Sequence, residues 1–154
     1  MPNIIILRGP YCSGKTTWAS KYCKKHKNSI RLAPMEIARS LASGGSVTEL
    51  IPISQEMVNS CILNAIILNK NIIIDGENFL DSQVKNLLEL IEDICKKNRQ
   101  KLIDKNIHYN ISIKVFNSTP LEVCLDRNNK MQNPKKESLI TKGYNYFHKI
   151  GKPF

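Results

Sequence analysis

The sequence predicts an α/β fold, a three-layer sandwich with a central parallel sheet, on three observations. Apolar runs of strand length occur at Asn3–Leu7, Asn71–Asp75 and Asn110–Phe116. Stretches with apolar residues at helical spacing separate these runs, and strands that alternate with helices are typical of parallel sheets. The apolar runs are continuous rather than alternating, as expected of strands covered on both faces.

The first half of the chain predicts two strand–helix pairs. The strand Asn3–Leu7 runs into a glycine-rich loop and then a helix from Thr16 to Lys25. Ser29–Leu32 predicts a second, shorter strand. Pro34 suits the first position of the helix predicted over Met35–Ser43, because proline lacks the N–H that this position leaves unbonded.

The second half predicts four helices around the two remaining strands. Ser54–Asn69 has apolar residues at helical spacing, and Ser54 is a plausible N-cap. Leu80–Arg99 predicts a long amphipathic helix. Leu121–Asn128 and Ser138–Ile150 predict the last two helices, and a polar, lysine-rich segment separates them. With 154 residues and no repeat or linker, we expect one domain over residues 1–154.

The composition indicates a cytoplasmic protein with an anionic partner. The net charge of +10 favours nucleic acid, nucleotides or an acidic surface. No apolar run approaches the length of a membrane span, and the chain enters its first strand without a signal peptide, so we expect no membrane partner. Dispersed cysteines without metal-binding spacing suit free thiols in a reducing cytosol. These cysteines are Cys12, Cys23, Cys61, Cys95 and Cys124.

The glycine-rich loop carries a phosphate-binding pattern, Gly9-x-x-x-x-Gly14-Lys15-Thr16. In this pattern, backbone N–H groups wrap the phosphates of a nucleotide, the lysine reaches the β- and γ-phosphates, and the hydroxyl holds Mg²⁺. The helix that follows directs its positive dipole end at the same phosphates. The pattern therefore predicts a site for ATP and Mg²⁺, with Thr16 as the metal ligand. Its residues are Gly9, Cys12, Ser13, Gly14, Lys15, Thr16 and Thr17.

Asp75 ends a buried strand beside this loop. Ligands of open parallel sheets bind at the carboxyl ends of the strands, so Asp75 is expected close to the transferred phosphate. An aspartate at this place can hold metal-bound water or anchor the hydroxyl that accepts the phosphate. The alternative interpretation is a strand-end aspartate that caps the next turn.

Three motifs give the chain a resemblance to polynucleotide 5′-hydroxyl kinases. Asp75-Gly76-Glu77-Asn78 resembles the Asp-x-Thr-Asn run of that family, and Thr17-Trp18-Ala19 resembles its extension of the phosphate loop. Phe116–Glu122, leading into Arg127-Asn128-Asn129-Lys130, is similar to the last strand and lid of the family. The resemblance covers nearly the whole chain.

The resemblance implies a P-loop NTPase fold with a C-terminal lid. It also implies transfer of the ATP γ-phosphate to the 5′-hydroxyl end of DNA or RNA. By the same resemblance, Lys15 binds the β- and γ-phosphates, while Arg127 and Lys130 close the lid. Asp75 and Asn78 hold the acceptor.

The general base of the family can be matched in two registers. In one register, Met35 stands where the family has the aspartate that takes the proton of the attacking hydroxyl. In the register shifted by one residue, Glu36 is the carboxylate that takes this proton, and Arg39 binds the acceptor phosphate. Two other functions stay open. One is a kinase of a nucleoside, nucleotide or metabolite, which the size and topology of the chain fit equally well. The other, motivated by Met35 and by the uncharged residues in the lid, is a degenerate nucleotide-binding module that acts through a partner. A second copy of the chain as partner is also left open.

Overall fold

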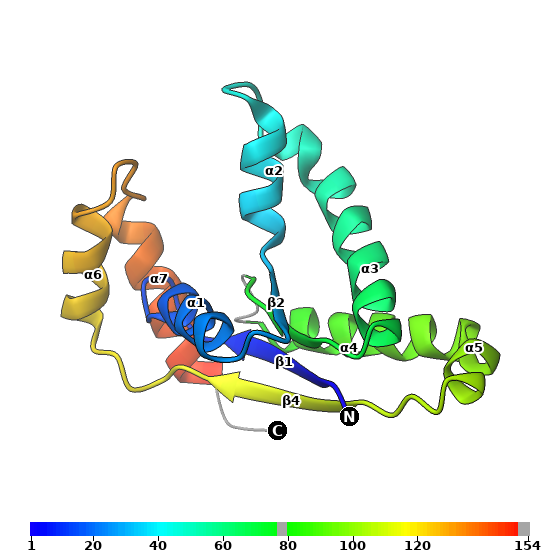
Figure 1. Cartoon of the computed structure of the whole chain (residues 1–154). Helices are drawn as coiled ribbons and strands as arrows, with labels where there is room; N and C mark the ends of the chain where they lie inside the picture. Colours follow the sequence, from blue (N-terminus) through cyan, green and yellow to red (C-terminus); the bar gives the residue numbers. More distant parts are fainter. Residues whose placement is uncertain (77–79, 151–154) are drawn as a thin grey trace.

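A computed structural model describes residues 1–76 and 80–150 and contains a four-stranded parallel sheet. The strand order is β2-β3-β1-β4, and every neighbouring pair is parallel (Figure 1). This confirms the expected α/β architecture. The strands are β1 Asn3–Arg8, β2 Ser29–Leu32, β3 Asn71–Ile74 and β4 Asn110–Val115.

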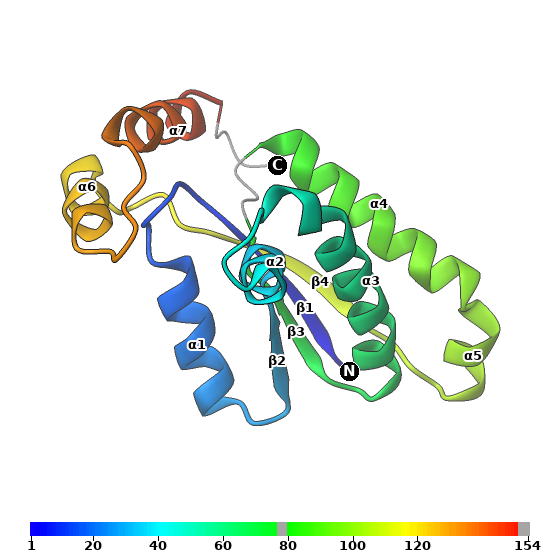
Figure 2. The ribbon, with the colours of Figure 1, turned by 90° about the horizontal axis from the view of Figure 1, so that it is seen from above.

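The isoleucine-rich strands build two apolar layers because successive side chains of a strand point to opposite faces. Ile4 and Ile6 join one buried cluster with residues of α3 (Ile51–Ile67) and α4 (Asp81–Lys97). Leu7 packs on the opposite face with Ala19 of α1 (Lys15–Lys25). Figure 2 shows α3 and α4 on one side of the strands and α1 on the other.

Five shorter or terminal elements complete the chain. A 3-10 turn joins α2 to α3, and α5 follows α4 after a break. The remaining pair, α6 and α7, pack against each other beside the phosphate loop (Figure 1). These elements are α2 Pro34–Ala42, the 3-10 turn Thr48–Leu50, α5 Arg99–Asp104, α6 Leu121–Asn129 and α7 Glu137–Ile150.

Two predicted helices, Ser54–Asn69 and Leu80–Arg99, differ from the structure by up to three residues at their ends, and no prediction covers α5. Helix α3 begins at Ile51, with Pro52 in its first turn, where a missing N–H costs nothing. Ser54 is therefore a buried residue inside the helix, and its hydroxyl donates to the Ile51 carbonyl (2.8 Å) instead of capping. The predicted helix Leu80–Arg99 ends at Lys97, and Asn98 caps it: the Asn98 backbone N–H and side-chain amide both donate to the Ile94 carbonyl (3.2 and 2.8 Å).

The segment Thr48–Ile67 has the length and apolar composition of a membrane-crossing helix, with a mean hydropathy of 1.3. This differs from the sequence expectation that no run approaches that length. Val58, Ile62 and Ile66 on its inner side are fully buried against the sheet cluster. Because its apolar side packs into the core of the domain, we interpret the segment as a core helix.

Candidate active site

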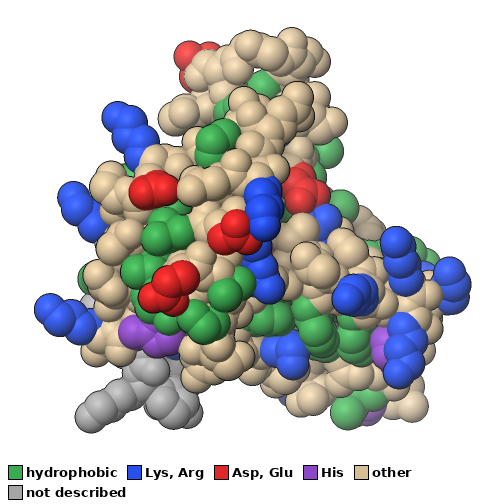
Figure 3. All heavy atoms as spheres, turned by 90° about the vertical axis from the view of Figure 1, so that its left-hand side faces the viewer, with side chains coloured by type: hydrophobic (Ala, Val, Ile, Leu, Met, Phe, Trp, Pro, Cys, Tyr) green, Lys and Arg blue, Asp and Glu red, His purple; other side chains and the backbone are tan. Residues whose placement is uncertain are grey.

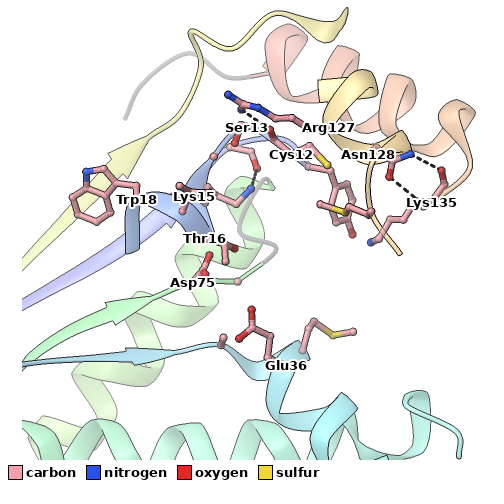
Figure 4. Close-up of a pocket in the computed structure, with 18 of the residues that line it drawn as sticks. Cys12, Ser13, Lys15, Thr16, Trp18, Glu36, Asp75, Arg127, Asn128 and Lys135 are labelled. Carbon is pink, nitrogen blue, oxygen red and sulfur yellow. Dashed lines mark hydrogen bonds between the residues drawn. The ribbon is translucent and has the colours of Figure 1, made fainter. Parts of the chain in front are cut away.

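A cavity of about 1020 Å³ opens at the carboxyl ends of the strands (Figure 4). The phosphate loop and the start of α1 form one wall, and α2 with the end of β3 forms another. Residues of α6 and of the segment before α7 form the third wall. The sequence motifs that are far apart in the chain thus meet around one space.

The phosphate loop adopts a conformation that few side chains tolerate. Cys12 and Gly14 have positive φ angles of 59° and 97°, and Gly14 caps α1 in the left-handed region. The Ser13 hydroxyl is buried and makes no hydrogen bond among the described residues. Buried polar groups are usually hydrogen-bonded, so this hydroxyl fits a ligand atom in the loop.

Side chains from elsewhere in the chain bind the carbonyl oxygens of the loop. Thr119 donates to the Ser13 carbonyl (3.0 Å), and Arg127 donates to the Cys12 carbonyl (2.9 Å). Lys15 donates to the carbonyls of Gly9 and Pro10 at 2.8 and 2.7 Å. These carbonyl oxygens carry partial negative charge, and the hydrogen bonds from Thr119, Arg127 and Lys15 neutralise part of it. An anion at the N-terminus of α1 is therefore favoured.

The residues present fit a nucleotide with Mg²⁺. Gly14, Lys15, Thr16 and Thr17 line the cavity together. Among the residues that the structure describes, no cluster of three or more His, Cys, Asp or Glu could hold a metal. A Mg²⁺ ion bound through the Thr16 hydroxyl and nucleotide phosphates needs no such cluster.

Cys12 lies inside the loop but is a poor nucleophile. Burial raises the pKa of its thiol, and the nearby charges of Lys15, Lys135 and Arg127 only partly oppose this. The thiol therefore stays protonated near neutral pH, which favours a filler role over a reactive one.

The predicted lid consists of α6 and the segment before α7. Its Arg127 lines the cavity as predicted, but the lysine that lines the cavity is Lys135 and not Lys130. The Lys130 ammonium pairs with Asp126 (2.7 Å), its side chain is 73% exposed, and the residue does not line the cavity. Lys135 lines it instead, with its ammonium 3.5 Å from the centre of the Tyr11 ring. The buried Asn128 side chain fixes this position by hydrogen bonds to the backbone N–H and C=O of Lys135.

The other end of the cavity is built around Arg31, which the sequence motifs did not indicate. Its Nε donates to Asp75 (2.7 Å), and its Nη1 donates to Glu36 (2.9 Å). Arg39 and Met35 line the same end. Figure 4 shows the carboxylates of Asp75 and Glu36 on the Thr16 side of the loop. The remaining predicted acceptor residue, Asn78, lies outside the described residues.

The only signal for Arg31 in the sequence is its position. It is a charged residue in the short strand β2, between Ile30 and Leu32. A cation inside a strand of an α/β sheet needs a partner, because burying an unpaired charge is costly. That argument could have directed attention to the carboxylates at the neighbouring strand ends.

Gly9→Ala should destabilise the protein and weaken ATP binding. A methyl group at Gly9 would lie 2.7 Å from the Phe116 carbonyl oxygen and 2.9 Å from the Phe116 Cβ. Since both contacts involve the chain just after β4, we expect a loss of about 2 kcal/mol or more in unfolding free energy. Denaturant titration and nucleotide titration measure the two effects.

Gly143→Ala is the matched control, since it adds the same methyl group within helix α7. The nearest atom would be a Tyr11 ring carbon at 3.8 Å, an ordinary contact. We expect it to be neutral or to stabilise the helix by up to about 1 kcal/mol. Equal stability losses for the two variants would contradict the close approach at Gly9.

The parallel sheet, the phosphate loop before α1 and the α6–α7 pair define a kinase-like P-loop nucleotide-binding domain. The family model described as an AAA domain matches residues 4–142, and the chain belongs to this family. No protein among the curated sequences matches the chain.

Solved structures support the fold. A chain of the Pnkp1/Rnl/Hen1 RNA repair complex is 23% identical with a TM-score of 0.75; the match covers 99% of this chain and 46% of that one. The tunicamycin resistance protein of Deinococcus radiodurans is 17% identical with a TM-score of 0.58, over 96% and 81% of the two chains. Shikimate kinase from Acinetobacter baumannii is 14% identical with a TM-score of 0.50, over 97% and 79%.

Proposed function

We propose that this chain transfers the γ-phosphate of ATP to the 5′-hydroxyl end of a nucleic acid. The observation that carries the proposal is the pair of carboxylates, Asp75 and Glu36, in the same cavity as the phosphate loop. A carboxylate within reach of a hydroxyl can orient it and accept its proton.

The charges in the cavity favour a hydroxyl acceptor over a phosphate acceptor. Lys15, Arg127 and Lys135 gather at the phosphate loop, where an anionic donor is expected. At the other end, the carboxylates of Asp75 and Glu36 balance the guanidinium groups of Arg31 and Arg39. Balanced charge at this end suits an uncharged 5′-hydroxyl group at the carboxylates better than a 5′-phosphate, so the backbone phosphates of a nucleic acid would have to bind positive charge outside this end.

In this proposal each residue has a positioning or electrostatic role. Lys15 and Arg127 neutralise charge that develops on the phosphates, Thr16 holds Mg²⁺, and Asp75 orients the acceptor hydroxyl. Glu36 takes the proton that the hydroxyl loses. When bound, Mg²⁺ supplies further neutralisation of the phosphate oxygens.

Positive charge supports nucleic acid as the acceptor. The chain carries a net charge of +10, and Lys21 of α1 lines the cavity. Lys24 and Lys25 end the same helix. Figure 3 shows lysine and arginine side chains at both edges and in the middle of one face, and several of them lie close together on its right-hand part. The similar chain of the RNA repair complex is in keeping with this class of acceptor, although the match covers less than half of it.

Transfer of labelled phosphate from ATP to a 5′-hydroxyl oligonucleotide tests the proposal. We expect labelled product with the 5′-hydroxyl oligonucleotide and none with the same strand bearing a 5′-phosphate. Lack of transfer with any divalent metal, while ATP still raises the melting temperature, would favour the degenerate nucleotide-binding module.

The salt dependence of acceptor binding separates nucleic acid from a small-molecule acceptor. Binding of an oligonucleotide should weaken steeply with salt, because each neutralised phosphate adds about 0.7 to the slope of log K against log salt. A small uncharged acceptor would give a slope near zero. Transfer to a nucleoside that exceeds transfer to the oligonucleotide would favour the small-molecule kinase.

A further inference from the structure

Arg31 lies between the end of β3, which is followed by Asp75, and the start of α2, which contains Glu36. It lies in β2, where it pairs in register with Ile73 of β3. The backbone N–H of Asp75 donates to the Leu32 carbonyl (2.9 Å), which fixes the end of β3 against the end of β2. Glu36 lies in the first turn of α2, immediately after β2.

The two edges of the Arg31 guanidinium each bind one carboxylate. Nη1 and Nη2 bind the two oxygens of Glu36 at 2.9 and 2.5 Å. Nε and Nη2 bind one oxygen of Asp75 at 2.7 and 2.6 Å. The bidentate contact with Glu36 fixes orientation as well as distance, and lysine cannot form it.

The burial of the three groups makes the arrangement asymmetric. The Asp75 side chain is 4% exposed, the Arg31 side chain 20% and the Glu36 side chain 50%. Burial opposes the charge on Arg31, but hydrogen bonds to Glu36 and Asp75 outweigh it and raise its pKa. Arg31 therefore stays charged, and its removal would leave a buried carboxylate without its cation.

We propose that Arg31 is a positioning residue, which holds the Glu36 carboxylate beside Asp75 at the acceptor end of the cavity. This proposal rests on the proposed function. Each Glu36 oxygen that accepts a hydrogen bond from Arg31 retains a second lone pair for the acceptor proton. Arg31 thus sets the direction of the base without contacting the reacting atoms.

The groups that face this ion cluster come from every element around it. Cys23 of α1 is close enough for its thiol to interact electrostatically with Arg31. The other charged groups of the same cavity are Lys15, Lys21, Arg39, Arg127 and Lys135. None of the described acidic side chains other than Asp75 and Glu36 lines the cavity.

Replacement of Arg31 by glutamine tests the proposal through catalysis. We expect R31Q to lower kcat roughly thirtyfold and to leave the ATP dissociation constant within about twofold of its original value. In the double variant R31Q/E36Q the loss of kcat should be about that of E36Q alone, because Arg31 acts only through Glu36. R31K should not restore kcat, since lysine cannot form the bidentate contact with Glu36.

Thermal stability gives a readout that does not depend on activity. R31Q removes the cation that binds the nearly buried carboxylate of Asp75, so we expect it to lower the melting temperature by about 5 °C at pH 7. R99Q, on the exposed surface of α5, should leave the melting temperature unchanged.

The outcomes separate the two proposals. Losses of kcat that multiply in the double variant R31Q/E36Q, or an unchanged melting temperature for R31Q, would overturn the positioning role and leave the kinase in place. If the unaltered protein transfers phosphate to no acceptor, the proposed function fails. In that case the stability data still decide whether Arg31 holds the two carboxylates.

Discussion

Lys15→Ala should lower phosphate transfer roughly a thousandfold. The Lys15 ammonium now binds the carbonyl oxygens of Gly9 and Pro10, which places it within the phosphate loop. In the loop pattern this ammonium reaches the phosphates that separate during transfer, so its charge is most valuable in the transition state. Single-turnover transfer from labelled ATP measures the loss, and nucleotide titration shows how much of it is binding.

Lys130→Ala is the matched control, because it removes the same charge from the end of α6. The Lys130 ammonium pairs with Asp126 and does not line the cavity, so we expect a change of less than about fivefold. A Lys15 variant with near-normal transfer would contradict the assignment of the donor site. A large loss in the Lys130 variant would instead indicate that the lid closes in a different arrangement.

Most of the fold could be predicted from local sequence signals. The isoleucine-rich runs at β1, β3 and β4 identify buried parallel strands, and the glycine-rich loop identifies the connection to α1. The errors are the ends of α3 and α4 and the short helix α5, which no prediction covers. Asn98 lies between α4 and α5, and because asparagine is compatible with a helix end and with a helix interior, its type alone does not predict the break.

The donor side of the site is predictable because its residues are contiguous in sequence. Gly9 to Thr17 form one loop and one helix end, and their spacing alone predicts a phosphate-binding site. The acceptor side and the lid instead depend on tertiary contacts. No spacing in the sequence places Arg31 between Glu36 and Asp75, and none shows that Asn128 directs Lys135 rather than Lys130 to the cavity.

Glu36→Gln should lower kcat about a hundredfold or more and leave ATP binding nearly unchanged. Loss of a general base typically costs this much, because the acceptor hydroxyl must then lose its proton to solvent. Glutamine keeps the size of the side chain and can still accept a hydrogen bond from Arg31, so the variant isolates the carboxylate charge. Steady-state kinetics with a 5′-hydroxyl oligonucleotide at saturating ATP give kcat directly.

Met35 provides the competing assignment and therefore the decisive comparison. Both Met35 and Glu36 line the cavity, but only Glu36 is bound to Arg31, whose other edge binds Asp75. If Glu36 is the base, M35D should not raise kcat, since a third carboxylate would disturb the balanced charges. A different result would be higher kcat for M35D together with unchanged kcat for E36Q. In that case the base of the family corresponds to position 35, and this chain, which has methionine there, is a nucleotide-binding domain that has lost the base.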